Sequence, residues 1–269
     1  MTVEKKKLPE DEKSKLESTS EALAIEEVKA VSEEPEGVLL KDESDWKPRT
    51  LIGRQVKSKE ITNIDTILDD GKNILESRII DELMPNLEID FIAVGQSKGK
   101  FGGGKRSIWR QTQKKTAEGN KPKFSALAFT GNRNGYIGIG YGKAKETVPA
   151  REKSVRKAKL NIMKIRRGCG SWECNCKTPH SIPFSVSGKC GSVKIILKPA
   201  PKGTGLVVEK ECAKLLSFAG IKDIHSTTFG MSRTKLNLIK ACIYALQKLN
   251  ATKIKEENVK NLGIVEGMV

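Results

Sequence analysis

The stretch ALAFTGNRNGYIGIGYGKAKETVPAREKSVRKAKL, residues 126–160, predicts two antiparallel strands followed directly by a helix. Small and apolar residues alternate from Ala126 to Thr130 and again from Tyr136 to Ile139, a pattern typical of strands. Between them, Asn132–Gly135 favours a hairpin turn, because Asn and Gly tolerate positive φ angles. After the hairpin, the spacing of the apolar residues changes to that of a helix.

The flanking residues extend this plan in both directions. A helical pattern begins at Ile61 and stops at Pro85, and alternating residues from Ile89 to Ala93 predict another strand. Downstream, the helical spacing that follows the hairpin continues to Ile165. Residues 61–166 therefore predict an α-β-β-β-α unit, which is also the plan of the double-stranded-RNA-binding fold.

The closing helix of this unit has two distinct sides. The arc predicted to pack on the sheet consists of Val148, Val155, Ala158, Ile162 and Ile165. The arc predicted to follow phosphates consists of Lys153, Arg156, Lys157 and Lys164. Arg151 on the apolar arc and Leu160 among the cations are exceptions to this division.

A second unit of mixed α/β type follows. Alternating residues at Ile182–Val186 and Val193–Leu197 predict a hairpin, and a helix over Val208–Ala219 leads to a short strand at Ile221–His225. A last helix buries apolar residues between Leu236 and Leu249. The whole chain is thus predicted to be α+β. The predicted division is a disordered acidic extension (1–58), the RNA-binding-like domain (59–168), a Cys/His-rich linker (169–180), the α/β domain (181–250) and a tail (251–269).

Charge and composition restrict the function. The chain has 49 Lys plus Arg against 33 Asp plus Glu, a net charge of +16, which favours a polyanionic partner. No long apolar run or signal peptide is evident, so we expect a soluble, cytoplasmic protein that does not bind membranes. With two histidines and no recognisable nucleophile, acid and base set, we expect neither an enzyme nor a small-molecule substrate.

Cations gather in the loop predicted between Gly95 and Lys123. This loop also contains glycines and Trp109, as expected of a finger that grips RNA; the alternative is a solvated loop without a specific contact. Its predicted RNA contacts are Lys98, Lys100, Lys105, Arg106, Arg110, Lys114 and Lys115. Those predicted on and before the closing helix are Lys143, Lys145, Arg156, Lys157 and Lys164.

Three cysteines and one histidine are closely spaced after this helix. Cys169, Cys174, Cys176 and His180 provide four ligands of the kinds that Zn²⁺ prefers, and Cys190 could replace one of them. The spacing is not that of a standard zinc finger, and the alternative is a turn with reduced thiols. A metal here would fix the junction between two folded units rather than create the fold.

Long segments of the chain resemble one known family. They are GNRNGYIGIGYGKAKE (131–146), REKSVRKAKLNIMKIRRG (151–168), PHSIPFSVSGKCGSVKIILKPAPKGTG (179–205), LLSFAGIKDI (215–224) and TFGMSRTKLN (228–237). The family is the universal small-subunit ribosomal protein S-five family, whose eukaryotic members are called S-two, and the resemblance covers roughly Ile61 to Leu249. The cysteine-rich link GCGSWECNC (168–176) resembles archaeal members.

This resemblance implies both a fold and a function. The second unit would contain a left-handed β-α-β crossover. The protein would bind small-subunit ribosomal RNA, border the channel through which messenger RNA enters, and support decoding accuracy. Lys143, Lys145, Arg166 and Arg167 match basic positions that face RNA, and Gly203, Thr204 and Gly205 match a stretch near the neighbouring protein S-four. The alternatives are a non-ribosomal zinc-containing RNA-binding regulator and a zinc-dependent RNA-modifying enzyme.

Overall fold

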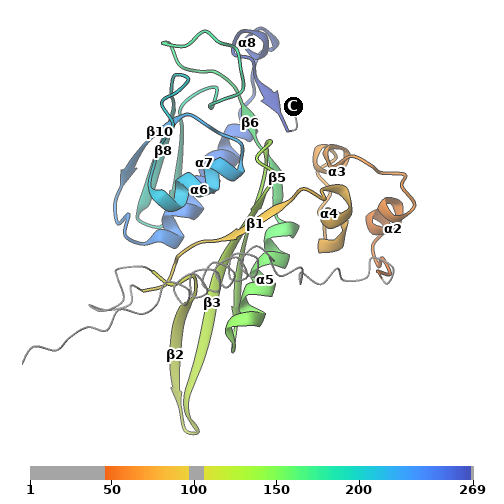
Figure 1. Ribbon diagram of the computed structural model, residues 1–269, viewed down its shortest axis with the longest axis vertical. Coiled ribbons are helices and arrows are strands. Elements are labelled where there is room, and N and C mark those ends of the chain that lie inside the picture. Colours follow the sequence, from red (N-terminus) through yellow and green to blue (C-terminus); the bar gives the residue numbers. More distant parts are fainter. Residues whose placement is uncertain (1–45, 97–105, 268–269) are drawn as a thin grey trace, which may run out of the picture. The chain divides into compact units, whose positions relative to one another are not determined.

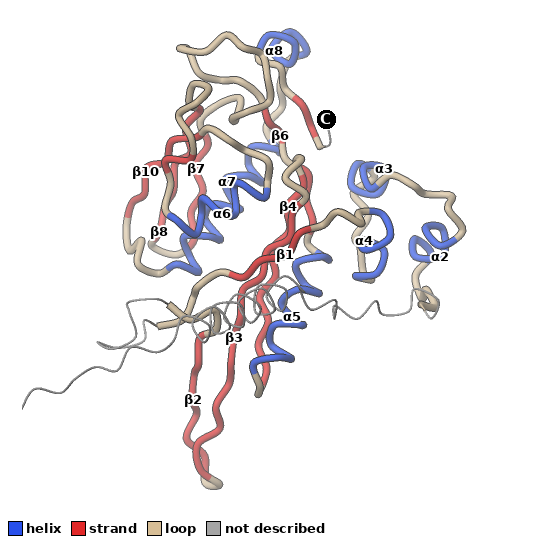
Figure 2. Tube along the Cα trace, viewed as in Figure 1, coloured by secondary structure: helices blue, strands red, loops and turns tan. Residues whose placement is uncertain are grey.

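The computed structural model describes residues 46–96 and 106–267, and Pro48–Val269 form one compact unit (Figures 1 and 2). Most of the predicted acidic extension and part of the predicted RNA finger lie outside the described residues. Within them, the chain mixes helices with antiparallel and parallel strands. The predicted α+β class is confirmed.

Three short helices precede the first sheet: α2 (Leu51–Lys57), α3 (Ile64–Asp69) and α4 (Ser77–Leu83). The single helix expected over residues 61–83 is wrong, because the chain turns at Gly71 with a φ of 65°. Helix α2 also corrects the boundary expected at residue 58. It begins at the N-cap Thr50, and the Glu76 carboxylate accepts the Thr50 N–H at 2.7 Å, so this part of the expected extension is folded.

The first sheet has more strands than expected. It consists of β1 (Glu88–Phe91), β2 (Arg110–Thr116), β3 (Gly119–Gly131), β4 (Tyr136–Ala144) and β5 (Ile162–Lys164), in the order β1-β3-β4-β5 with β2 also paired to β3. From Arg110 to Lys123, the expected loop is therefore a β2–β3 hairpin. Because the residues of β2 are almost all polar and exposed, no apolar alternation marks the strand in the sequence. Phe124 is the first β3 residue paired with β4. The residues of β3 before it pair only with β2, so the hairpin continues past the end of β4 (Figure 2).

Helix α5 (Thr147–Leu160) packs on this sheet through small residues. It buries Ala150, Ser154 and Ala158 against β4, where a Cβ added to Gly140 would lie 2.1 Å from the Ser154 carbonyl oxygen. The predicted apolar arc is therefore only partly right: Ala158 is buried, but Val148 is 59% exposed. The helix also ends before Ile162 and Ile165, since the chain turns back there to form β5.

The second sheet belongs to the C-terminal half of the chain. It comprises β7 (Val186–Cys190), β8 (Val193–Pro199), β10 (Ile224–Phe229) and β9 (Leu206–Val207), in that order. A hairpin forms here as predicted, with its second strand in place, but its first strand is Val186–Cys190 rather than Ile182–Val186. Helix α6 (Lys210–Phe218) connects β9 to β10, which pair in parallel, and helix α7 (Lys235–Ala251) packs on β7, where a Cβ on Gly188 would lie 2.0 Å from the Ala241 carbonyl oxygen.

The two halves share one hydrophobic core. Phe129 of β3 and Leu215 of α6 belong to the same buried cluster, and the rings of Phe129 and Phe218 meet edge to face at 4.7 Å. The expected tail is also part of the fold, because helix α8 (Glu256–Asn261) leads to β11 (Val265–Glu266), which pairs with β6 (Arg166–Arg167). The helix-sheet units predicted separately are thus joined into one body.

Candidate nucleic-acid interface and metal site

One face of the first sheet changes along its length from apolar to cationic. Gly140 and Gly142 of β4 face α5, so by strand alternation Tyr141 and Lys143 point to the opposite face. At one end of that face, Leu127 and Phe129 are buried in the shared core. The other end lies away from α6 and α7 and carries three of the predicted RNA contacts, Arg110, Lys114 and Lys143.

Register places two of these cations in one row. Arg110 of β2 pairs with Ser125 of β3, and Ser125 pairs with Lys143 of β4, so all three side chains share a face. The row continues into the hairpin through Lys114 with Lys121 and through Lys123. We call this set the cationic face: Arg110, Lys114, Lys121, Lys123 and Lys143.

The side chains of the cationic face are exposed and mostly unpaired. Lys121 forms an ion pair with Glu118 at the hairpin turn. Among the described residues, none of the other four has an ionic partner. Such a row repels itself unless an anion neutralises it, which is the electrostatic arrangement expected for phosphates. Lys121 and Lys123 were not among the predicted contacts, because the hairpin register was needed to align them.

Other predicted contacts lie elsewhere. Arg106 and Lys145 are exposed, whereas Lys115 alternates to the side of the sheet that α5 covers. Arg156 and Lys157 are exposed on α5 itself, on the side of the sheet opposite the cationic face. The structure therefore does not gather all predicted RNA contacts on one surface. Lys98, Lys100 and Lys105 lie outside the described residues.

Three predicted RNA contacts form internal interactions instead. Lys164 forms ion pairs with Asp69 and Glu266, and Arg166 pairs with Glu266 through Nε at 2.5 Å. Arg167 is only 4% exposed, and burial lowers the pKa of its guanidinium. Arg167 is thus too buried to face RNA as expected, whereas for the half-buried, ion-paired Lys164 and Arg166 contact with RNA stays a prediction. The reason is the return of the C-terminal strand β11 onto β6, which the sequence pattern did not reveal.

Arg151 of α5, the charged residue on the predicted apolar arc, packs against aromatic rings. Its guanidinium lies 5.0 Å from the Phe91 ring centre and 5.7 Å from the Trp109 ring centre. These cation–π contacts explain a charge on the inward side of the helix. Trp109 thereby links the base of the β2–β3 hairpin to α5. Nearby, the Gly95 N–H donates to the Ser107 carbonyl at 2.9 Å.

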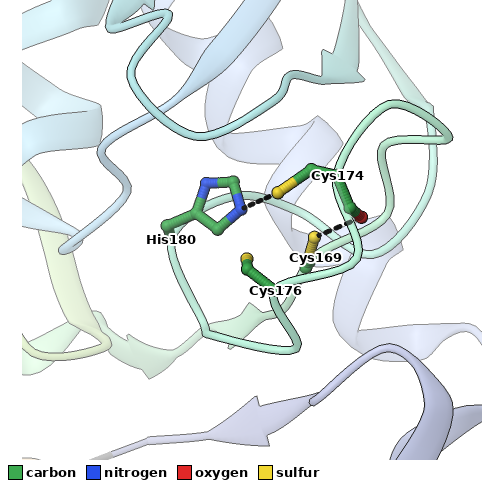
Figure 3. A group of neighbouring side chains, drawn as sticks. All are labelled: Cys169, Cys174, Cys176 and His180. Atoms are coloured by element: carbon green, nitrogen blue, oxygen red, sulfur yellow. Dashed lines mark hydrogen bonds between the residues drawn. The ribbon is translucent and has the colours of Figure 1, made fainter.

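The four predicted metal ligands converge. The thiol sulfurs of Cys169, Cys174 and Cys176 and a ring nitrogen of His180 all lie within 4.8 Å of one another (Figure 3). The Cys174 Sγ and His180 Nε2 atoms are 3.8 Å apart. Ligands at zinc distances of roughly 2.0–2.3 Å stand about 3.5–3.8 Å from each other in a tetrahedron, so small adjustments would allow coordination. Cys190, the predicted substitute ligand, is not part of this cluster.

The thiols of the cluster have different acidities. A hydrogen bond with the Thr178 hydroxyl, whose oxygen lies 3.0 Å from the sulfur, lowers the pKa of Cys176 to about 6. Burial raises the pKa of Cys169 to about 11. A cation at the centre would oppose this rise, since metal ligation favours the thiolate.

A residue far along the sequence orients the histidine. His180 Nδ1 lies 2.8 Å from Asp223 Oδ2, and both side chains are buried. This contact leaves Nε2 directed at the cysteines and matches the carboxylate–histidine arrangement found around zinc. Asp223 was missed in the sequence because 43 residues separate it from His180. The segment is further anchored where the Cys169 N–H donates to the Leu262 carbonyl at 2.8 Å.

The stretch predicted to contact a neighbouring protein lies beside Asp223. The Asp223 Oδ1 atom accepts the N–H groups of Gly203 at 3.0 Å and Gly205 at 2.9 Å. Both glycines adopt positive φ angles, and Thr204 between them is half-buried. The predicted metal site and the predicted contact loop therefore share one carboxylate.

Comparisons with known proteins identify both halves of the chain. Residues 108–166 match the family model "Ribosomal protein S5, N-terminal domain", and residues 188–258 match "Ribosomal protein S5, C-terminal domain". The chain is 47% identical over 225 residues to small ribosomal subunit protein uS5 of Nanoarchaeum equitans, covering 84% of this chain and 96% of the relative. It is 46% identical to the same protein of Methanocaldococcus jannaschii, covering 84% and 97%.

These similarities bear on several predictions at once. The resemblance to archaeal members of the family is confirmed, and so is the prediction that the chain is not an enzyme, because the relatives are structural ribosomal proteins. None of the described helices is long and apolar enough to cross a bilayer. The chain belongs to the uS5 family of small ribosomal subunit proteins.

Proposed function

We propose that this chain works in the cytoplasm as a structural component of the small ribosomal subunit and binds ribosomal RNA through the cationic face. The observation that carries this proposal is the row formed by Arg110, Ser125 and Lys143 across three strands. Each cation that meets a phosphate releases condensed counterions, so such a row binds RNA without base readout.

The β2–β3 hairpin is the part of this face best suited to enter RNA. Its tip, from Lys114 to Lys121, pairs with no other strand of the described residues, and the side chains of Lys114 and Lys121 are exposed. A narrow hairpin with cations on both strands can lie between phosphate backbones that a broad sheet cannot reach. Arg151, stacked on Phe91 and Trp109, holds its base against α5.

The finer role follows the family resemblance. We propose that the protein borders the channel through which messenger RNA enters and supports decoding accuracy. We also propose that Gly203, Thr204 and Gly205 contact the neighbouring protein S-four. The support for this contact is a half-exposed glycine loop with a fixed conformation, which allows another backbone to approach closely.

We include a structural Zn²⁺ in this proposal. The fit of Cys169, Cys174, Cys176 and His180 to a four-ligand site supports it, as does the buried carboxylate behind His180. The ion would tie the linker between the two halves of the chain. Metal analysis of the purified protein tests this directly: about one equivalent of zinc is expected, and less than about a tenth of an equivalent in metal-replete protein would reject it.

Sedimentation of a cell extract at moderate salt tests the ribosomal role. The chain is expected in the small-subunit fractions, with little at the top of the gradient. A chain that stays at the top and is absent from small subunits would instead favour the non-ribosomal RNA-binding regulator. Zinc-dependent turnover of an RNA substrate would be required for the remaining alternative, an RNA-modifying enzyme.

A further inference from the structure

The cluster of Cys169, Cys174, Cys176 and His180 is linked to a surface loop by one side chain. The Asp223 carboxylate contacts the His180 ring through Oδ2 at 2.8 Å, and its Oδ1 accepts the Gly203 and Gly205 N–H groups at 3.0 and 2.9 Å. Asp223 is 4% exposed, so water does not readily replace any of these hydrogen bonds. One rigid carboxylate thus contacts the candidate metal site on one side and the loop on the other.

We propose that Asp223 couples metal occupancy to the conformation of the loop 201–205, so that the loop presents its protein-binding surface when the metal is bound. This inference rests on the zinc site and the contact loop of the proposed function. It makes Asp223 a positioning residue, because Asp223 acts through His180 and does not itself touch the metal.

The coupling follows from the chemistry of imidazole. A histidine that binds a metal through Nε2 carries its proton on Nδ1, and that N–H donates to Asp223 Oδ2. The metal thereby fixes the ring and makes the N–H a stronger donor, which holds the carboxylate in one orientation. Without the metal, His180 can exchange its tautomer or turn its ring, and the carboxylate loses its fixed partner.

The loop depends on that orientation. Within the described part of the chain, neither the Gly203 nor the Gly205 N–H has an acceptor other than Asp223. Gly203 and Gly205 have φ angles of 91° and 75°, but a glycine can adopt many other backbone conformations. These two hydrogen bonds therefore select the conformation of the loop. A separate hydrogen bond, from the Ile224 N–H to the Gly205 carbonyl at 3.1 Å, keeps the loop end attached to β10. Loss of the metal is therefore expected to loosen the loop without unfolding the sheet.

A simpler interpretation is that Asp223 only caps the loop and the metal plays no part. Amide hydrogen exchange of the full-length chain distinguishes the two, with ZnCl₂ as the probe and a chelator as the reference state. With about one bound equivalent of zinc, we expect the Gly203 and Gly205 amides to exchange at least about tenfold more slowly than in chelated protein. Zinc that binds and slows amides at Cys174 but leaves the two glycines unchanged would overturn the coupling while keeping the metal site.

Asp223→Asn tests the same link from the other side. If the Asn oxygen accepts from the glycines, its NH₂ group faces Nδ1 and moves the histidine proton to Nε2, which blocks ligation. If the amide turns, its NH₂ group faces two N–H donors. We therefore expect zinc affinity to fall about 10- to 100-fold, and the effect of saturating zinc on the two glycine amides to fall below about twofold.

The matched control is Asp90→Asn, a half-buried carboxylate on β1 whose Oδ2 lies 3.8 Å from Lys214 Nζ. This variant is expected to keep both the zinc affinity and the tenfold protection. A full zinc effect on the glycines in Asp223→Asn would overturn the proposal. Failure of the unmodified chain to bind zinc would overturn the metal site and, with it, the coupling.

Discussion

The Arg167 guanidinium donates through Nη2 to the carbonyl of Gly267 at 2.9 Å, inside the protein. The same nitrogen also donates to Asn134 Oδ1 at 2.9 Å, in the turn that precedes β4. Arg167 therefore joins the C-terminal end of the described chain to the first sheet. A residue that the family resemblance assigned to RNA is instead buried within the fold.

Arg167→Ala is expected to destabilise the protein by about 2–4 kcal/mol, because it leaves the buried Gly267 carbonyl and the half-buried Asn134 oxygen without this donor and opens a cavity. Urea unfolding, followed by circular dichroism, measures this. The control is Arg156→Ala on the exposed side of α5, which is expected to change the free energy of unfolding by less than about 0.5 kcal/mol. Equal free energies of unfolding for the two variants would show that the Arg167 side chain does not stabilise the fold.

Gly140→Ala is expected to destabilise the contact between α5 and β4 by about 3 kcal/mol or more. The new Cβ would lie 2.1 Å from the Ser154 oxygen and 2.2 Å from the Ala158 nitrogen, and both are backbone atoms that cannot move alone. Gly71→Ala is the matched control. Its Cβ meets nothing within 4 Å, and only its φ of 65° is unfavourable, so a loss of about 1 kcal/mol is expected. The same urea unfolding measurement compares the two, and similar losses would show that α5 does not pack this closely.

Cys176 is expected to be the first cysteine alkylated by iodoacetamide in chelated protein. Because its pKa is lowered to about 6, its reactive thiolate is already abundant at pH 7, and its rate should rise between about pH 5 and 7 and then level off. An ordinary thiol continues to gain reactivity up to about pH 9. Mass spectrometry of the alkylated peptides gives both rates. A Cys176 rate that keeps rising beyond pH 8 would contradict the hydrogen bond with Thr178.

The sequence was sufficient for the elements with clear apolar periodicity. The turn at Asn132–Gly135 and strand β8 were predicted because their residues tolerate positive φ or alternate, whereas the strand expected at Ile182–Val186 forms later, at Val186–Cys190. Strand β2 was missed because its residues are polar on both faces. The apolar arc of α5 was misplaced because the glycines of β4 leave room for the helix to pack closely through its small residues. A helical wheel of α5 alone carries no information about the residues of β4.

The candidate sites were predictable only where the residues are close in the sequence. The cluster from Cys169 to His180 could be recognised from its spacing, whereas Asp223 required the fold. Likewise, counting cations identified a basic region but could not separate Lys143, which is exposed, from Arg167, which is buried. Long-range pairing decides which charges remain free, and local patterns do not encode it.

Binding to small-subunit ribosomal RNA tests the cationic face most directly. The variant Arg110→Glu with Lys143→Glu reverses two charges of the face, and Lys253→Glu with Lys260→Glu makes the same change in net charge at exposed residues outside it. Filter binding of an archaeal small-subunit ribosomal RNA is measured over a range of salt concentrations.

The Arg110→Glu, Lys143→Glu variant is expected to bind RNA about tenfold or more weakly. The slope of the logarithm of its affinity against the logarithm of the salt concentration should fall in magnitude by about 2, since two phosphate contacts are removed. The control is expected to lose less than about twofold. Equal losses in the two variants would show that net charge alone attracts the RNA and would contradict an interface built on the cationic face.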